Sequence, residues 1–386
     1  MLTWLRRTRR GEGAGDGPAE GRRLRALTVA TVSRSLALQS PEAWRTLEER
    51  GYDLTFAAAR DAWTGPLLAR YTGSVFVEIP AERRLRPRTL LDLAGRLRRL
   101  STQRWDLVQV QSPIISVLWR TVATGRARRR TIYVVHGFHF QPGERGLRGR
   151  AARLIEAALA HRTQALATVS AADHRFVTSL PRLLRPPVVV ALPGAGVPVE
   201  HYRGGTPPPA DAPTSPYALF VGDLNANKDP LCAVAAVEEC RARGRLLDLV
   251  VIGEGTLAAD LSRAAGSRPW LRLVERSDEV PLWMAHAAVL LAPSYREGVP
   301  RVVIEALASG TPVVARRNRG TAELLADGLG QVLTTGDSGA WADAVERAVA
   351  APPDTAAMWA RASAYGVEPF RRAYAALVSQ VEPHGS

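Results

Sequence analysis

Two glutamates flank the expected start of a helix in the stretch from Pro293 to Gly328. Glu297 lies in a loop after the apolar run AAVLLA, and Glu305 lies on the second turn of a helix expected from Pro300 to about Ala308. Unpaired backbone N–H groups at a helix start bind phosphate, and a carboxylate accepts hydrogen bonds from two hydroxyls at once. The spacing therefore predicts a site for a sugar and a phosphate. The alternative is a crossover helix with two solvent-exposed glutamates.

The same stretch, EGVPRVVIEALASGTPVVA followed by the element from Gly320 to Glu323, resembles the E-x7-E signature of the retaining family 4 glycosyltransferases, which have the GT-B fold. This resemblance implies that Glu297 holds the hydroxyls of a donor sugar and that Glu305 holds the ribose. The loop and the helix start after Glu297 would then bind the donor diphosphate. The residues expected to contribute there are Gly298, Val299, Arg301 and Val302.

Lys228 is the only lysine among 51 basic residues, so the position is expected to need a compact ammonium. It lies in FVGDLNANKDP, residues 220–230, where a strand, a polar loop and a helix start follow one another. An ammonium there can neutralise a diphosphate as it leaves, and the alternative is a solvated loop lysine. The family usually has both an arginine and a lysine here. The arginine position holds Asp223, as in the G-E-L-N-x-N-K variant of the capsule, exopolysaccharide and O-antigen branch, which puts a two-cation clamp in doubt.

Three further loops follow expected strands. By the same resemblance, His136 in VVHGFHF is the candidate to reach the donor sugar, where a neutral imidazole can hydrogen-bond a hydroxyl; a histidine packed at a strand end is the alternative. Gly222 ends the strand before the Lys228 loop. By the resemblance, Gly253 and Gly255 line the nucleotide and Arg276 lies near the base. The glycine pair usual after the first strand is replaced by TVSRSLALQ, which is expected to change how the acceptor side closes over the phosphates.

No D-x-D pair is present, so neither a divalent metal nor another cofactor is expected at the diphosphate, and the P-loop and G-x-S-x-G motifs are absent as well. Cys232 and Cys240 are expected to be small core residues in a reducing compartment. No apolar run approaches the length of a membrane span, and ALTVATVS is too short and polar for a persuasive signal peptide.

Positive charge is concentrated in the first half of the chain, within a formal net charge of +14. Residues 1–200 contain 33 arginines against 16 acidic residues, whereas residues 201–386 contain 18 basic and 21 acidic residues. A basic face attracts phosphates, nucleic acid or an anionic bilayer, and the alternative is an arginine-rich proteome. Nucleic acid is disfavoured because no reading motif or aromatic platform is recognisable.

Short apolar strands alternate with helices and predict an α/β architecture of two doubly wound, Rossmann-like domains that face one cleft. One such helix runs from Arg148 to His161, with Leu154, Ile155, Ala158 and Leu159 as its apolar side. The expected segments are a disordered basic N-terminus (1–23), an acceptor domain (24–202), a Gly/Pro-rich linker (203–216), a nucleotide-sugar domain (217–355), and a helix with tail that crosses back (356–386).

The resemblance implies a metal-independent, retaining enzyme that moves a sugar from a nucleotide diphosphate sugar, expected to be UDP-linked. The expected acceptor is a saccharide on undecaprenyl diphosphate, used for bacterial surface polysaccharide at the cytoplasmic leaflet of the plasma membrane. Two alternatives stay open. One is a tailoring enzyme for a soluble metabolite or lipid, and the other is a non-catalytic subunit that binds sugar nucleotides.

Overall fold

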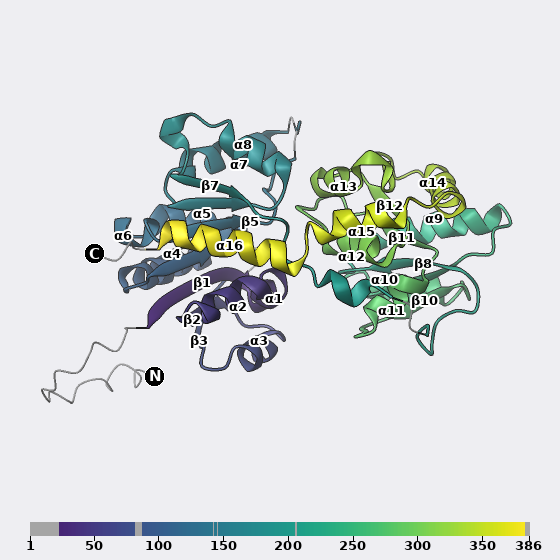
Figure 1. Ribbon diagram of the computed structural model, residues 1–386, viewed down its shortest axis with the longest axis horizontal. Helices are drawn as coiled ribbons and strands as arrows, with labels where there is room; N and C mark the ends of the chain where they lie inside the picture. The colour runs from purple at the N-terminus through teal and green to yellow at the C-terminus, as the bar shows by residue number, and fades with distance from the viewer. Residues whose placement is uncertain (1–22, 82–86, 142, 145, 205–206, 383–386) are drawn as a thin grey trace, which may run out of the picture.

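The computed structural model describes residues 23–81, 87–141, 143–144, 146–204 and 207–382, and these form two α/β domains (Figure 1). The expected disordered segment 1–23 lies outside the described residues except for Arg23. Residues 205–206 of the expected linker and the end of the tail, 383–386, also lie outside them.

In the described part of the chain, the first domain has a parallel sheet of seven strands in the order β3-β2-β1-β4-β5-β6-β7. The strands are β1 (Leu24–Val32), β2 (Tyr52–Ala59), β3 (Val75–Glu78), β4 (Leu107–Val110), β5 (Thr131–Val135), β6 (Ala165–Thr168) and β7 (Val188–Ala191). The helices are α1 (Ser33–Gln39), α2 (Pro41–Glu49), α3 (Thr64–Arg70), α4 (Pro87–Thr102), α5 (Pro113–Val122), α6 (Gly125–Arg128), α7 (Leu147–Ala160) and α8 (Ala171–Thr178).

The second domain has a parallel sheet of six described strands in the order β10-β9-β8-β11-β12-β13. The strands are β8 (Tyr217–Val221), β9 (Asp248–Ile252), β10 (Leu271–Val274), β11 (Val289–Ala292), β12 (Val313–Arg316) and β13 (Gln331–Leu333). The helices are α9 (Pro230–Ala242), α10 (Ala258–Ala265), α11 (Val280–His286), α12 (Arg301–Ser309), α13 (Arg319–Leu324), α14 (Ser338–Ala350) and α15 (Thr355–Ser363). Helix α16 (Val367–Val381) follows them in the chain.

The central strands of both sheets are continuous apolar runs. Every residue of β5 (TIYVV) and of β11 (VLLA) is buried, because helices cover both faces of each sheet. Strands buried on both faces are typical of parallel α/β sheets. Two apolar cores therefore flank each sheet, and the loops at the carboxyl ends of the strands are left free to form a site.

The C-terminal helices divide between the two domains. Helix α15 packs against α12 in the second domain, and α16 crosses to the first domain, where it contacts α2 (Figure 1). Phe370 and Tyr374 of α16 are buried in the same core as Trp44. The Tyr374 hydroxyl also donates a hydrogen bond of 2.5 Å to Gln109. By packing in this core, α16 links the end of the second domain to the first domain.

The buried face of helix α7 is the opposite of the face that its apolar pattern predicts. Leu154 and Ile155 are exposed, at 70% and 45%, whereas Glu156 is buried. The reason is a buried partner: Glu156 accepts a hydrogen bond of 2.7 Å from Arg120, whose side chain is fully buried. An ion pair inside the domain thus orients the helix and leaves apolar side chains on the surface.

Candidate functional site

The loops that follow β8 and β11 bring together the two charged residues singled out in the sequence. Lys228 Nζ lies 2.5 Å from Glu297 Oε1, and their side chains are 25% and 16% exposed. The loops are also tied through Asn227, whose side-chain amide donates to the Arg296 carbonyl at 3.0 Å. The ammonium and the carboxylate therefore form one charged unit at the carboxyl edge of the second sheet.

Glycines allow the loops after β8 and β9 to approach each other closely. A Cβ added to Gly253 would lie 1.9 Å from the Gly222 carbonyl oxygen, and one added to Gly255 would lie 2.4 Å from the Leu224 carbonyl oxygen. Both residues also have φ near +155°, a conformation that side chains rarely adopt. The stem of Lys228 lies over Gly222, within 3.8 Å of its Cβ position. All three glycines thus shape the surface beside the lysine.

Helix α12 begins at Arg301, one residue later than the sequence predicts, because Pro300 has an extended ψ of 113° and is the N-cap. Its first turn carries Val302 and Arg301, and Arg301 donates across the cleft to the Leu38 carbonyl at 2.7 Å. Val299, just before the helix, packs against cores of both domains. The start of α12 therefore lies at the boundary between the two domains.

Glu305 is largely buried, with a side chain only 13% exposed. Burial raises the pKa of its carboxyl, and the charge of Arg301, a hydrogen bond with Tyr202 and the charge of Lys228 oppose that shift. Glu305 thus lies on the same side of α12 as the Lys228–Glu297 unit. Its carboxyl shares a hydrogen bond with Tyr202.

His136 directly follows strand β5 of the first domain, and its backbone contacts the second domain. A Cβ added to Gly298 would lie 1.8 Å from the His136 carbonyl oxygen, so only glycine permits this approach between the domains. The imidazole Nε2 lies 3.4 Å from the Ser40 hydroxyl. Burial lowers the pKa of His136 from 6.5 to about 4. His136 is therefore neutral near pH 7 and able to donate one hydrogen bond and accept another.

A cavity of about 740 Å³ opens beside this contact, with lining residues from both domains. Its polar lining includes His136, His139, Gln141, Arg148, Arg296 and Glu297. The Lys228-paired carboxylate of Glu297 lies at its edge. The arrangement offers hydrogen bonds for hydroxyls and guanidinium groups for an anion within one space.

Arg276 lies after β10 and contacts residues of both domains. Its guanidinium pairs with Glu254 at 2.8 Å and lies 5.2 Å from the ring centre of Trp63 in the first domain. It therefore joins the loops of the two domains at the edge of the cleft.

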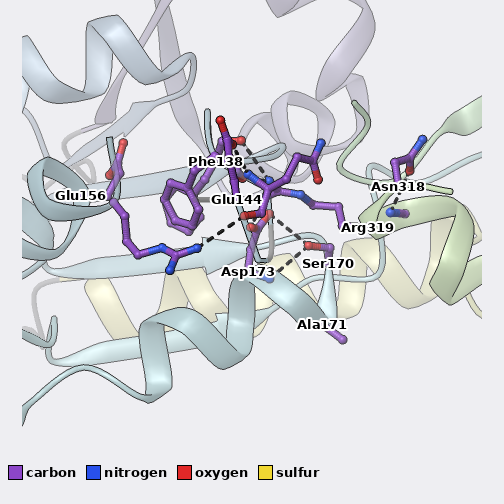
Figure 2. A network of polar contacts seen from close by, with 12 residues as sticks. Phe138, Glu144, Glu156, Ser170, Ala171, Asp173, Asn318 and Arg319 are labelled. Atoms are coloured by element: carbon purple, nitrogen blue, oxygen red, sulfur yellow. Dashed lines mark hydrogen bonds and ion pairs between the residues drawn. The ribbon is translucent and has the colours of Figure 1, made fainter. Parts of the chain in front are cut away.

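A buried polar network between the domains was not predicted from the sequence. Arg319 at the start of α13 pairs with Asp173 of α8, and it also donates to the carbonyls of Phe138 and Phe140 (Figure 2). Both charged side chains are at most 3% exposed. Burial raises the pKa of Asp173, which the nearby charge of Arg319 opposes. The sequence signals only the start of α8 here, because Ser170 and Asp173 have the spacing of a helix-capping pair.

Glu323 extends this contact. It accepts a hydrogen bond of 2.8 Å from the Ala171 backbone N–H at the start of α8 and one of 3.0 Å from the Tyr365 hydroxyl. The element from Gly320 to Glu323, which carries part of the family resemblance, therefore binds the first domain in this structure.

Among the residues that the structure describes, no group of three or more His, Cys, Asp or Glu could hold a metal ion. The described helices also include none that is long and apolar enough to cross a membrane.

Two family models match separate halves of the chain. Residues 36–195 match the glycosyl transferase 4-like domain, and residues 215–351 match the glycosyl transferases group 1. The EpsD protein of Bacillus subtilis, named as a glycosyltransferase, is 27% identical over 263 residues, which are 64% of this chain and 68% of EpsD. The D-inositol 3-phosphate glycosyltransferase 2 of Catenulispora acidiphila is 34% identical over 41% of this chain and 42% of its own, so less than half of that relative is spanned.

Solved structures share the fold along almost the whole chain. HepE of Anabaena in complex with UDP-glucose has a TM-score of 0.69 at 16% identity, covering 92% of this chain and 99% of HepE. Each half of the chain matches its own glycosyltransferase domain, and the two domains face each other as in this fold. The chain belongs to the GT-B glycosyltransferases.

Proposed function

We propose that this glycosyltransferase moves a sugar from a nucleotide diphosphate sugar, with a UDP-sugar as the expected donor, and retains the configuration of the anomeric carbon. The observation that carries the proposal is the ion pair of Lys228 and Glu297 beside the start of α12. It offers a cation and helix N–H groups to a diphosphate, next to a carboxylate for sugar hydroxyls. HepE, which has the same fold, is seen in complex with UDP-glucose.

In this proposal the bond between the anomeric carbon and the diphosphate oxygen breaks, and the charge on the leaving oxygen is stabilised by Lys228 and by the N–H groups after Glu297. The acceptor hydroxyl attacks the same face of the sugar and gives its proton to the leaving phosphate. Neutral His136 binds a donor hydroxyl. No metal cofactor is invoked, because Lys228 supplies the positive charge at the leaving group.

The proposed acceptor is a lipid-linked saccharide of bacterial surface polysaccharide synthesis, carried on undecaprenyl diphosphate at the cytoplasmic leaflet. Arg148 and Arg296 line the cavity next to Glu297 and offer contacts for an anionic carrier. Arg148 is on α7, whose Leu147, Leu154 and Ile155 are exposed. Apolar side chains beside arginines suit the surface of an anionic bilayer.

A soluble phosphorylated acceptor is the second candidate. It is favoured by the same two arginines and by the likeness to an inositol phosphate glycosyltransferase. A non-catalytic subunit that binds sugar nucleotides is the candidate of another class, and the presence of Lys228, Glu297 and Glu305 argues against it.

The deciding experiment measures release of nucleotide diphosphate from UDP-, GDP- and ADP-sugars in EDTA, with lipid-linked and soluble phosphorylated acceptors. We expect one UDP-sugar to react with the lipid-linked acceptor, and the anomeric configuration of the product is then read by NMR. Turnover only with the soluble acceptor favours the second candidate. Binding of a donor without turnover on any acceptor favours the non-catalytic subunit.

A further inference from the structure

Arg34 of the first domain reaches across the cleft to the loop that carries Lys228. Its guanidinium Nη2 lies 2.5 Å from Asp223 Oδ1, and the side chains are 40% and 31% exposed. Asp223 follows Gly222 at the carboxyl end of β8, and the stem of Lys228 lies over that glycine. The guanidinium of Arg34 is therefore held from the first domain at the part of the cleft where Lys228 lies.

The backbone of Arg34 is fixed by its own domain. Its N–H donates to Asp61 Oδ2 at 2.9 Å, and the preceding Ser33 hydroxyl lies 2.8 Å from the Thr64 hydroxyl in a buried contact. A long side chain leaves this anchored position and projects over the cleft. The Arg34 guanidinium thus extends from a fixed backbone position and not from a mobile loop.

The charge of Arg34 makes the region beside Asp223 more favourable for an anion. Lys228 is paired with Glu297, and Asp223 adds a second carboxylate beside them. A diphosphate entering next to Asp223 without a further cation would meet repulsion. The ion pair with Asp223 is made through Nη2 and leaves other guanidinium N–H groups able to donate, since arginine has five.

We propose that Arg34 binds the donor diphosphate from the first domain and that Asp223 holds its guanidinium in place for this contact. The proposal rests on the proposed function and deepens it, because it assigns the second cation of the diphosphate site to the opposite domain. The diphosphate would then be held by Lys228 from the second domain and by Arg34 from the first.

A double-mutant cycle on the full chain separates this contact from a plain ion pair between the domains. UDP affinity is measured by calorimetry for the wild type, Arg34→Ala, Asp223→Asn and the double variant, together with kcat and KM for the donor. Arg371→Ala is the matched control, because it removes an ion pair with Glu49 between α16 and α2, away from the cleft.

We expect Arg34→Ala to weaken UDP binding about tenfold or more even in the Asp223→Asn background, because a charge-assisted hydrogen bond to the diphosphate is lost. Arg371→Ala keeps the wild-type affinity. Equal UDP affinity of Asp223→Asn and the double variant overturns the proposal, since Arg34 then serves only to pair with Asp223. If the wild type binds no UDP, GDP or ADP, the proposed function itself fails, and this proposal fails with it.

Discussion

Lys228 and Glu297 form an ion pair of 2.5 Å although they are 69 positions apart and belong to different loops of the second domain. The pair fixes the ammonium beside the start of α12, and the lysine stem lies over Gly222. Each residue neutralises the other, and together they suit a ligand that carries both negative charge and hydroxyls. A sugar diphosphate has this combination of groups.

Lys228→Ala is expected to lower kcat of donor turnover by about 10²- to 10³-fold, because the charge on the leaving diphosphate loses a preorganised partner. Lys228→Arg is expected to recover only part of this activity, since a planar guanidinium differs in shape from an ammonium. Nucleotide release in EDTA measures both variants. Glu238→Gln, which removes an exposed partner of Arg268, is the control and should match the wild type. Unchanged kcat in Lys228→Ala would remove the lysine from the mechanism.

Gly298→Ala is expected to reduce donor turnover at least tenfold while each domain stays folded. The new Cβ would lie 1.8 Å from the His136 carbonyl oxygen, which is backbone and can move only if the domains separate. Gly266→Ala is the control, because its nearest neighbour would lie at an ordinary 3.5 Å. Small-angle scattering together with activity measures the change, and wild-type turnover in Gly298→Ala would show that the close approach of the domains is dispensable.

The buried pair of Arg319 and Asp173 should show strong coupling in stability. Removing one partner leaves an uncompensated buried charge, so Asp173→Asn or Arg319→Met alone is expected to lower the free energy of unfolding by about 3–5 kcal/mol. The double variant should lose less than the sum of the two single changes. Denaturant unfolding of the four proteins checks this. Additive losses would mean that the two residues act independently.

The sequence predicts the sheets and the Lys228 and Glu297 loops well, because buried strands are continuous apolar runs and each motif follows such a strand. It misplaces the face of α7, since periodicity takes apolar Leu154 and Ile155 as the inner side. The residue that reverses this orientation is Arg120, which lies 36 positions from Glu156. A partner at that distance leaves no periodic signal in the chain.

Contacts between the domains were missed for the same physical reason. Arg34 and Asp223 are 189 positions apart, and Arg319 and Asp173 are 146 apart. Each looks like an ordinary surface charge within its own segment. Their pairing depends on how the two sheets face each other, and local sequence patterns carry no information on that arrangement.

The exposed face of α7 should mediate binding to anionic bilayers. Replacing Leu147, Leu154 and Ile155 by Ser removes apolar area that can enter the headgroup region, so binding to vesicles with phosphatidylglycerol should fall at least tenfold. Sedimentation with vesicles measures it. Leu246→Ser is the control, because this leucine is 65% exposed on the second domain. Equal binding of the triple variant and the wild type would place the membrane contact elsewhere or favour a soluble acceptor.

His136 should make folding stability depend on pH between about 6.5 and 4. Burial lowers the pKa of His136 in the folded state to about 4, while the imidazole keeps the ordinary value of 6.5 in the unfolded chain. Between these pH values His136 takes up a proton in the unfolded state but not in the folded state, so the free energy of unfolding falls as the pH falls. His136→Gln removes this proton uptake, and its stability should therefore fall less steeply than that of the wild type. Urea unfolding at pH 7 and pH 5 measures both proteins, and His161→Gln shows whether removing an exposed histidine has the same effect. Parallel losses in wild type and His136→Gln would mean that another group is responsible for the acid sensitivity.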